Sequence, residues 1–239
     1  YEFSGFTFRG GISLSATSDV YLHDFVLDSN TLYGVTNGGA GTATVEYATG
    51  TGSTSAFFGG SNLTVRYCYV YDVGADHSKG GNNMSLISNY FRDGGTRTPG
   101  AHADVIQFSG STNEVINNVR VLGNRFDIPW LGYDHVANCC FFFKPEGGTQ
   151  GFTNVQADGN WFNGGGYTTY LIGSLVGPDS LRYIHYTNNR WGYGYLFGTM
   201  NANGWDKTSD HVKLESSGGT YSGNGLVKTL DAGSIVFYN

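Results

Sequence analysis

The residues of this chain that could do chemistry gather in one repeated pattern. The segment from Asp76 to Lys79 is echoed by the segment from Asp104 to Gln107, and counterparts in the two segments are 28 residues apart. A third copy, near residue 144, would put Lys144 over Gln107. Because only 13% of all residues are charged, this concentration of polar groups predicts a site. The candidate catalytic residues are Asp76, His77, Lys79, His102, Asp104, Gln107 and Lys144.

Two reactions would use such a column of side chains. In a lyase, a lysine would neutralise a sugar carboxylate, a histidine would take the proton from carbon, and a tyrosine would protonate the departing oxygen. In a glycosidase, Asp76 and Asp104 would be the carboxylate pair. Adjacent coils would hold them about 5 Å apart, closer to a retaining than to an inverting spacing. The alternative is structural, with the polar side chains bonding only to one another and to turns.

Aromatic residues in expected loops form a second group of candidates. Exposed rings offer flat apolar surfaces to sugars, and their polar tips bond hydroxyl groups. The expected substrate-binding residues are Trp130, Tyr133, Glu146, Tyr167, Tyr170, Trp191 and Tyr193. Packing inside the fold is the alternative for many of these rings. Phe126, Trp161 and Phe162 adjoin the repeat described next and are assigned to packing ladders.

An asparagine followed by aromatic residues recurs through the chain. It occurs at Asn89, Asn124, Asn160 and Asn189, and Cys68 takes the same place in a fifth copy. A coil of about 21 residues with insertions explains the spacing and suits three short strands joined by three bends. Asparagine tolerates left-handed backbone geometry at a bend, and its amide can bond to copies above and below.

The segments around these markers alternate apolar and polar residues with a period of two, which indicates strands. The sequence therefore predicts an all-β fold, a single-stranded right-handed parallel β-helix with long loop insertions; a β-sandwich is the alternative. One domain over residues 1–239 is expected, with coils to about residue 205 and a cap or last coil over 206–239. A Gly-rich excursion is expected near 38–60, and shorter loops at 92–100 and 173–180. The strand-like opening at Tyr1 is interpreted as part of a longer protein.

Several segments resemble a known group of proteins. Residues 100–107 and 121–126 are similar to the H-x-D-x-I-Q and GN-x-F segments of right-handed β-helix repeat proteins of the pectate-lyase-like superfamily, found in bacteria and bacteriophages. Residues 142–144, 160–167 and 187–191 extend the resemblance, which covers roughly 63–197. The resemblance implies the fold and a polysaccharide partner. It leaves the reaction open, because that superfamily includes lyases, hydrolases, epimerases, tailspikes and inert scaffolds.

The composition limits the classes of function. A net charge of −6 argues against a general nucleic-acid binder, and 17 Tyr, 16 Phe and 4 Trp argue against disorder. Three cysteines imply no disulfide framework, and no apolar run is long enough to span a membrane. No cofactor is indicated; Ca²⁺ is open, although no dedicated calcium motif is present.

Two hypotheses follow from these observations. The first is an extracellular protein, secreted or on a phage virion, that recognises a polysaccharide as a lyase, a glycoside hydrolase or a binder. The second is a non-catalytic structural module of a bacteriophage tail, tailspike or surface fibre. A homotrimer or assembly into a larger fibre is open under both hypotheses, but no heptad repeat enforces one.

Overall fold

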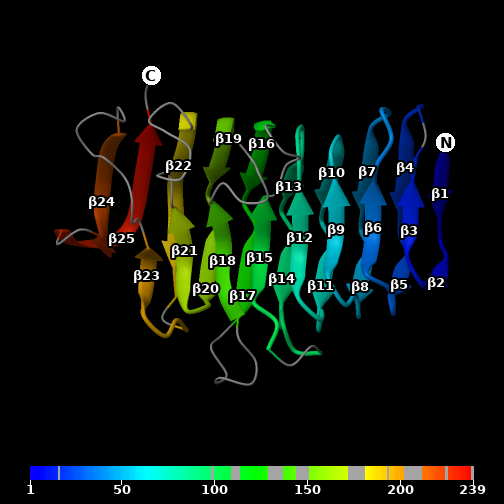
Figure 1. Cartoon of the computed structure of the whole chain (residues 1–239), viewed down its shortest axis with the longest axis horizontal. Helices are drawn as coiled ribbons and strands as arrows, with labels where there is room; N and C mark the ends of the chain where they lie inside the picture. Colours follow the sequence, from blue (N-terminus) through cyan, green and yellow to red (C-terminus); the bar gives the residue numbers. More distant parts are fainter. Residues whose placement is uncertain are drawn as a thin grey trace.

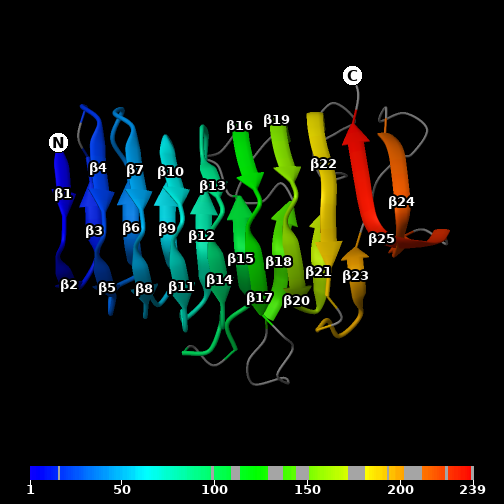
Figure 2. The same ribbon diagram turned by 180° about the vertical axis from the view of Figure 1, so that it is seen from behind.

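The fold of this chain is a stack of coils, each made of three short strands (Figures 1 and 2). The computed structural model describes residues 1–15, 17–97, 100–108, 114–128, 137–143, 151–171, 181–192, 194–201, 212–223 and 226–237. None of these residues is helical. Successive coils place corresponding strands side by side in parallel, so three sheets run along the long axis of the molecule. The fold is a parallel β-helix, as the sequence predicts.

The first sheet contains the strand that opens each coil. Its strands pair in parallel from one end of the stack toward the other. They are β1 (Glu2–Ser4), β4 (Val20–His23), β7 (Ala43–Glu46), β10 (Leu63–Arg66), β13 (Ser85–Ile87), β16 (Val115–Leu122), β19 (Gly151–Asp158) and β22 (Leu181–Trp191).

The second sheet follows after a tight bend. It contains β2 (Thr7–Arg9), β5 (Val26–Asp28), β8 (Thr49–Thr51), β11 (Tyr69–Tyr71), β14 (Tyr90–Arg92), β17 (Arg125–Ile128), β20 (Trp161–Gly164) and the end of β22. All of these neighbours are parallel.

The third sheet completes each coil and carries most of the predicted site. It contains β3 (Ile12–Leu14), β6 (Tyr33–Asn37), β9 (Ala56–Gly60), β12 (Asp76–Gly80), β15 (Ala103–Phe108), β18 (Ala137–Phe143), β21 (Tyr167–Leu171) and β23 (Gly198–Asn201). Its neighbours are parallel as well.

The asparagine markers stack inside the bend between the first and second sheets. Asn124 shows the pattern: its backbone N–H and its side-chain amide both donate to Oδ1 of Asn160, at 2.9 and 3.0 Å, and the amide also donates to the Leu86 carbonyl at 2.8 Å. Cys68 takes the same place, and its N–H donates to Asn89 Oδ1 at 2.9 Å. The predicted superposition of markers is confirmed. The left-handed residue, however, is the one before the marker, such as Tyr67 with φ 57° or Asn188 with φ 53°.

Aromatic rings fill the interior at corresponding positions of neighbouring coils. Phe91 stacks on Phe126 with 5.4 Å between ring centroids, and Phe126 stacks on Phe162 with 5.0 Å. The packing ladder predicted for Phe126 and Phe162 is therefore confirmed. Trp161 faces outward instead and is 38% exposed, because neighbours in a strand point to opposite faces of the sheet.

The prediction of a Gly-rich excursion near residues 38–60 is wrong. Strands β7, β8 and β9 in this stretch form a regular coil. Its small residues make room for a large ring in the interior: a Cβ added at Gly50 would lie 2.2 Å from Phe57, and one at Gly34 would lie 2.9 Å from Phe57. Phe57 thus supplies the volume that its neighbours lack.

The stacking pattern changes at the C-terminal end of the chain. β24 (Val212–Gly223) and β25 (Leu226–Phe237) pair antiparallel with each other, and β25 pairs antiparallel with β22. The predicted loop at 92–100 lies between β14 and β15, whereas 173–180 falls outside the described residues. Within the part of the chain that the structure describes, no helix is long and apolar enough to cross a membrane.

Candidate groove on the third sheet

The two copies of the polar pattern lie in the predicted register on neighbouring strands. Lys79 of β12 pairs with Gln107 of β15, and Ser78 pairs with Ile106. The Asp104 N–H donates to Asp76 Oδ1 at 2.7 Å, which places the two acidic residues on adjacent coils. Stacking of the repeat therefore brings the acidic and the long polar residues into two columns.

Both carboxylates are buried under neighbouring groups. Asp76 is 2% exposed and pairs through Oδ2 with the Lys79 ammonium at 3.2 Å. Asp104 is also 2% exposed, and its Oδ1 accepts from the Asn138 amide at 2.8 Å and from the Cys139 thiol at 3.0 Å. Lys79 is about one-third exposed. Lys79 is therefore the charged group of this cluster that is exposed to solvent, and Asp76 positions it.

His77 lies in the interior of the stack. The sequence had instead predicted it as a catalytic residue of the polar column. It is fully buried, its ring packs edge-on against Phe91 at 5.5 Å, and Nε2–H donates to the Arg92 carbonyl at 2.8 Å. Burial disfavours the charged imidazolium and lowers the pKa of His77 to about 4. This side chain stabilises the interior of the coil and does not reach the outward face of the third sheet.

The third copy of the pattern is two residues out of the expected register. Gln107 pairs with Phe142 and not with Lys144, and Asp104 pairs with Cys139, with an irregularity between Ala103 and Asp104. Core packing sets this register, because the buried side chain of Ile106 lies on the buried ring of Phe141. His102 is exposed just before β15. Lys144, Glu146, Trp130, Tyr133 and Tyr193 lie outside the described residues.

Of the predicted aromatic contacts, Tyr167 and Tyr170 lie on the third sheet beyond the acidic column. Tyr170 pairs with Phe142, and the Tyr167 ring contacts both Tyr170 and Phe197 with 5.5 Å between centroids. Burial, with Cys139, Tyr167 and Asp104 nearby, raises the pKa of Tyr170 to about 12, so its phenol stays protonated. Phe197 is 63% exposed and was missed by the sequence analysis.

Trp191 does not belong to this surface. It is partly buried against the hydrophobic core at the end of β22, and its indole N–H lies 3.4 Å from Thr169 Oγ1. The substrate-binding role expected for Trp191 therefore has no support from its position.

A hollow next to Lys79 was also missed by the sequence analysis. Outward positions on the third sheet run Thr36, Gly59, Lys79 and Gln107, so a glycine interrupts a column of side chains. The gap opens into a hollow of about 390 Å³ between Tyr33, Lys79 and Glu114, floored by glycines. A second hollow of about 380 Å³ adjoins it over β3 and β6 and shares Ser13, Tyr33 and Thr36. The available signal was the pair Gly59-Gly60 within a strand, since glycine in a strand often marks a close approach.

The arrangement is that of a parallel β-helix protein with two adjoining hollows and further polar and aromatic side chains on the outward face of one sheet. No family model matches the chain, and no curated protein and no solved structure matches it either. Among the described residues, no group of three or more His, Cys, Asp or Glu side chains is arranged to hold a metal ion.

Proposed function

We propose that this chain binds an extended polysaccharide along the outward face of the third sheet. The observation that carries the proposal is the gap at Gly59, which places an open hollow between the Tyr33 ring and the Lys79 ammonium. Tyr33 is 38% exposed and offers an apolar face beside polar donors and acceptors, which is the combination that sugars bind.

The length of the groove supports a chain-like ligand. The two hollows extend from β3 to β12, the strand of Asp76, and Tyr167, Tyr170 and Phe197 lie on coils beyond Asp104. Successive coils are about 4.8 Å apart, comparable with the length of one sugar ring. A polysaccharide lying along the stack would therefore contact a new coil with about every residue.

The burial of the carboxylates favours recognition over cleavage. A glycosidase needs one carboxyl group at the leaving oxygen and one at the anomeric carbon or its water. Asp76 and Asp104 are each 2% exposed and already hold an amide, a thiol or an ammonium group. A lyase or hydrolase role therefore stays a prediction, and the function that we propose is binding.

A non-catalytic module of a phage tail or surface fibre is the second candidate, and the same burial favours it over an enzyme. Membership of the pectate-lyase-like superfamily and an extracellular location remain part of the proposal. They are supported by the repeat fold and by the H-x-D-x-I-Q resemblance around Asp104.

The experiment is a polysaccharide-binding array followed by affinity measurement with Gly59→Leu. The added side chain would start 3.2 Å from Thr36 and 3.5 Å from the Tyr33 ring, and so would fill the hollow. Thr64→Leu is the matched control, because Thr64 lies on the first sheet, away from the groove. We expect at least a tenfold loss of affinity for Gly59→Leu and none for the control. Equal binding by both variants, or no binding of any glycan by the unchanged chain, would overturn the proposal.

A further inference from the structure

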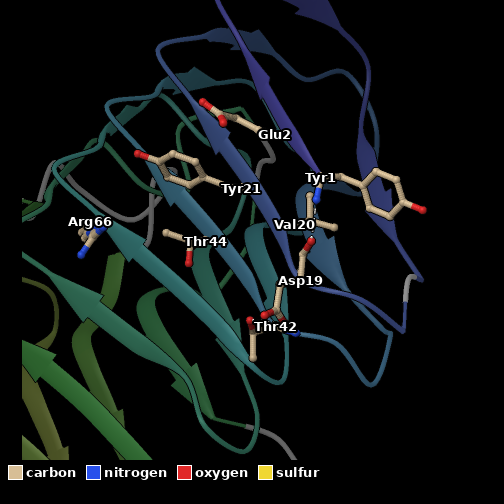
Figure 3. A pocket seen from close by; sticks show the side chains of 8 residues that line it. All are labelled: Tyr1, Glu2, Asp19, Val20, Tyr21, Thr42, Thr44 and Arg66. Carbon is tan, nitrogen blue, oxygen red and sulfur yellow. Dashed lines mark hydrogen bonds between the residues drawn. The ribbon is translucent and has the colours of Figure 1, made fainter.

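A second hollow site lies on the first sheet, away from the groove. It measures about 650 Å³ and opens over β1, β4, β7 and β10. Figure 3 shows Thr44 between Tyr21 and Arg66, with Asp19 next to Thr42 at the other side of the hollow. None of the residues of the third-sheet groove lines this hollow.

One wall is made of an aromatic ring that is held in place from two directions. The Tyr21 hydroxyl donates to Glu46 Oε2, and the His23 ring stacks on Tyr21 with 4.5 Å between centroids. Hydrogen bonding to Glu46 raises the pKa of Tyr21 to about 12. The phenol therefore stays a donor to Glu46. The Tyr21 ring lines the hollow, and His23 stacks on one of its sides.

The facing wall carries a guanidinium group whose position is set by the same carboxylate. Glu46 is only 5% exposed, and its Oε1 pairs with Arg66 Nε. The Arg66 side chain is 42% exposed and lines the hollow. A buried carboxylate thus fixes a ring and a donor next to each other in the lining of one hollow.

The remaining wall supplies acceptors and hydroxyl groups. Asp19 Oδ1 accepts from the Thr42 N–H at 3.2 Å and from the Thr42 hydroxyl at 2.8 Å. The hydrogen bond from the Thr42 side chain lowers the pKa of Asp19, so the carboxylate is ionised at neutral pH. The carboxylates of Glu2, Asp19 and Glu46 outnumber the Arg66 guanidinium and the Tyr1 ammonium, which contacts the Asp19 carbonyl, so the hollow keeps an acidic surround while His23 is neutral.

From these walls we infer that the hollow is a second carbohydrate site, which takes an uncharged sugar unit. A rigid ring face accommodates the apolar side of a pyranose. Arg66, Thr44 and Asp19 offer donors and acceptors to its hydroxyl groups. The acidic surround disfavours uronic acids and other anionic sugars. This inference does not depend on the third-sheet groove.

The test is an NMR titration of the whole chain. The probes are uncharged trisaccharides of glucose, galactose, mannose, xylose and rhamnose, with trigalacturonate as the anionic probe. We expect saturable shifts of the amides of residues 42–45 with at least one uncharged probe and none with trigalacturonate. Thr44→Tyr should weaken this binding at least tenfold by filling the hollow. Gln156→Tyr, at the corresponding position of the same sheet four coils away, should not.

The outcomes separate the two sites. Gly59→Leu should leave the shifts at residues 42–45 unchanged, so failure of the groove proposal would not remove this one. Titration of the unchanged chain alone tests the inference, even if Thr44→Tyr is too unstable to be measured. An absence of saturable shifts there with every uncharged probe, or a stronger response to trigalacturonate, would overturn the inference.

Discussion

The outward faces of the third and first sheets both use a buried carboxylate to place a cation at the surface. On the third sheet Asp76 holds Lys79 from within one strand and also accepts the Asp104 amide of the next coil. On the first sheet Glu46 holds Arg66 of the next coil and the Tyr21 hydroxyl. In both places a buried carboxylate, Asp76 or Glu46, acts as an anchor, whereas the cation that it holds is partly exposed.

The two faces differ most in their histidines. His77 is buried behind the third sheet without a carboxylate partner among the described residues. His23 lies on the outer face of the first sheet between Glu2 at 2.9 Å and Asp24 at 2.6 Å. Burial lowers the pKa of His77, and hydrogen bonds to Asp24 and Glu2 raise the pKa of His23. The two faces should therefore respond to pH in opposite directions.

The largest expected effect is the pH dependence due to His77. Its pKa is about 4 in the folded chain and 6.5 in the reference state, so the unfolded chain binds the extra proton between these values. Above pH 6.5 His77 is neutral in both the folded and the unfolded chain, so the free energy of unfolding is at its full value. As the pH drops from 6.5 toward 4, the unfolded chain takes up the proton first, and the free energy of unfolding falls by roughly 3 kcal/mol in total. Urea unfolding between pH 4 and 7 measures it. His77→Gln, which keeps a donor for the Arg92 carbonyl, should flatten the profile, and an unchanged slope would contradict the assignment.

The next effect is the loss of the third-sheet anchor. Asp76→Ala leaves the buried Asp104 N–H without its acceptor and Lys79 without its carboxylate. We expect about 2 kcal/mol of lost unfolding free energy. Asp76→Asn keeps an acceptor for the amide and should lose less. Equal losses for the two variants, measured by urea unfolding, would show that the amide contact is not the main term.

Loss of the first-sheet anchor should cost less. Glu46→Ala removes the partner of Tyr21 and Arg66, but Arg66 is 42% exposed and water can solvate it. We expect about 1 kcal/mol. The same denaturation assay compares the two anchors directly, with Glu46→Gln as the isosteric control. A Glu46→Ala loss larger than that of Asp76→Ala would reverse the comparison.

The smallest effect should come from His23. Its raised pKa gives stability that is fully present below the unfolded pKa and is lost as the pH rises through the folded value. His23→Gln should remove this alkaline-side decline and leave the acid-side change due to His77 untouched. Chemical shifts of the two imidazoles across the pH range check both assignments, and a depressed pKa at His23 would contradict this one.

Much of this fold was predictable because the repeat leaves a local signature. The asparagine at residues 89, 124, 160 and 189 marks one bend, and its ladder of side-chain hydrogen bonds explains why that residue recurs. The register of Asp76 over Asp104 followed from a separate signal, the 28-residue spacing of the polar pattern. The regular coil at 38–60 was not predictable from composition, because glycines such as Gly50 fit close neighbours in the stack, here the Phe57 ring that fills the interior from another strand.

The site was predicted less completely than the fold. Sequence spacing put polar residues on neighbouring coils, but it did not tell inward from outward positions, so His77 and Trp191 were placed on the surface. The hollow beside Tyr33 depends on a missing side chain at Gly59, and spacing alone does not show an absence. The offset of Lys144 by two residues arose because core packing of Ile106 on Phe141 outweighed the alignment of polar side chains.

The central claim is that a polysaccharide lies along the outward face of the third sheet. A crystal structure of the chain with the glycan that it binds in the array would test it most directly. The account predicts a sugar ring over Gly59, between the Tyr33 ring and the Lys79 ammonium, with further rings along the sheet. Sugar rings on the second sheet, or an empty hollow at Gly59 in a complex that holds the glycan elsewhere, would contradict the claim.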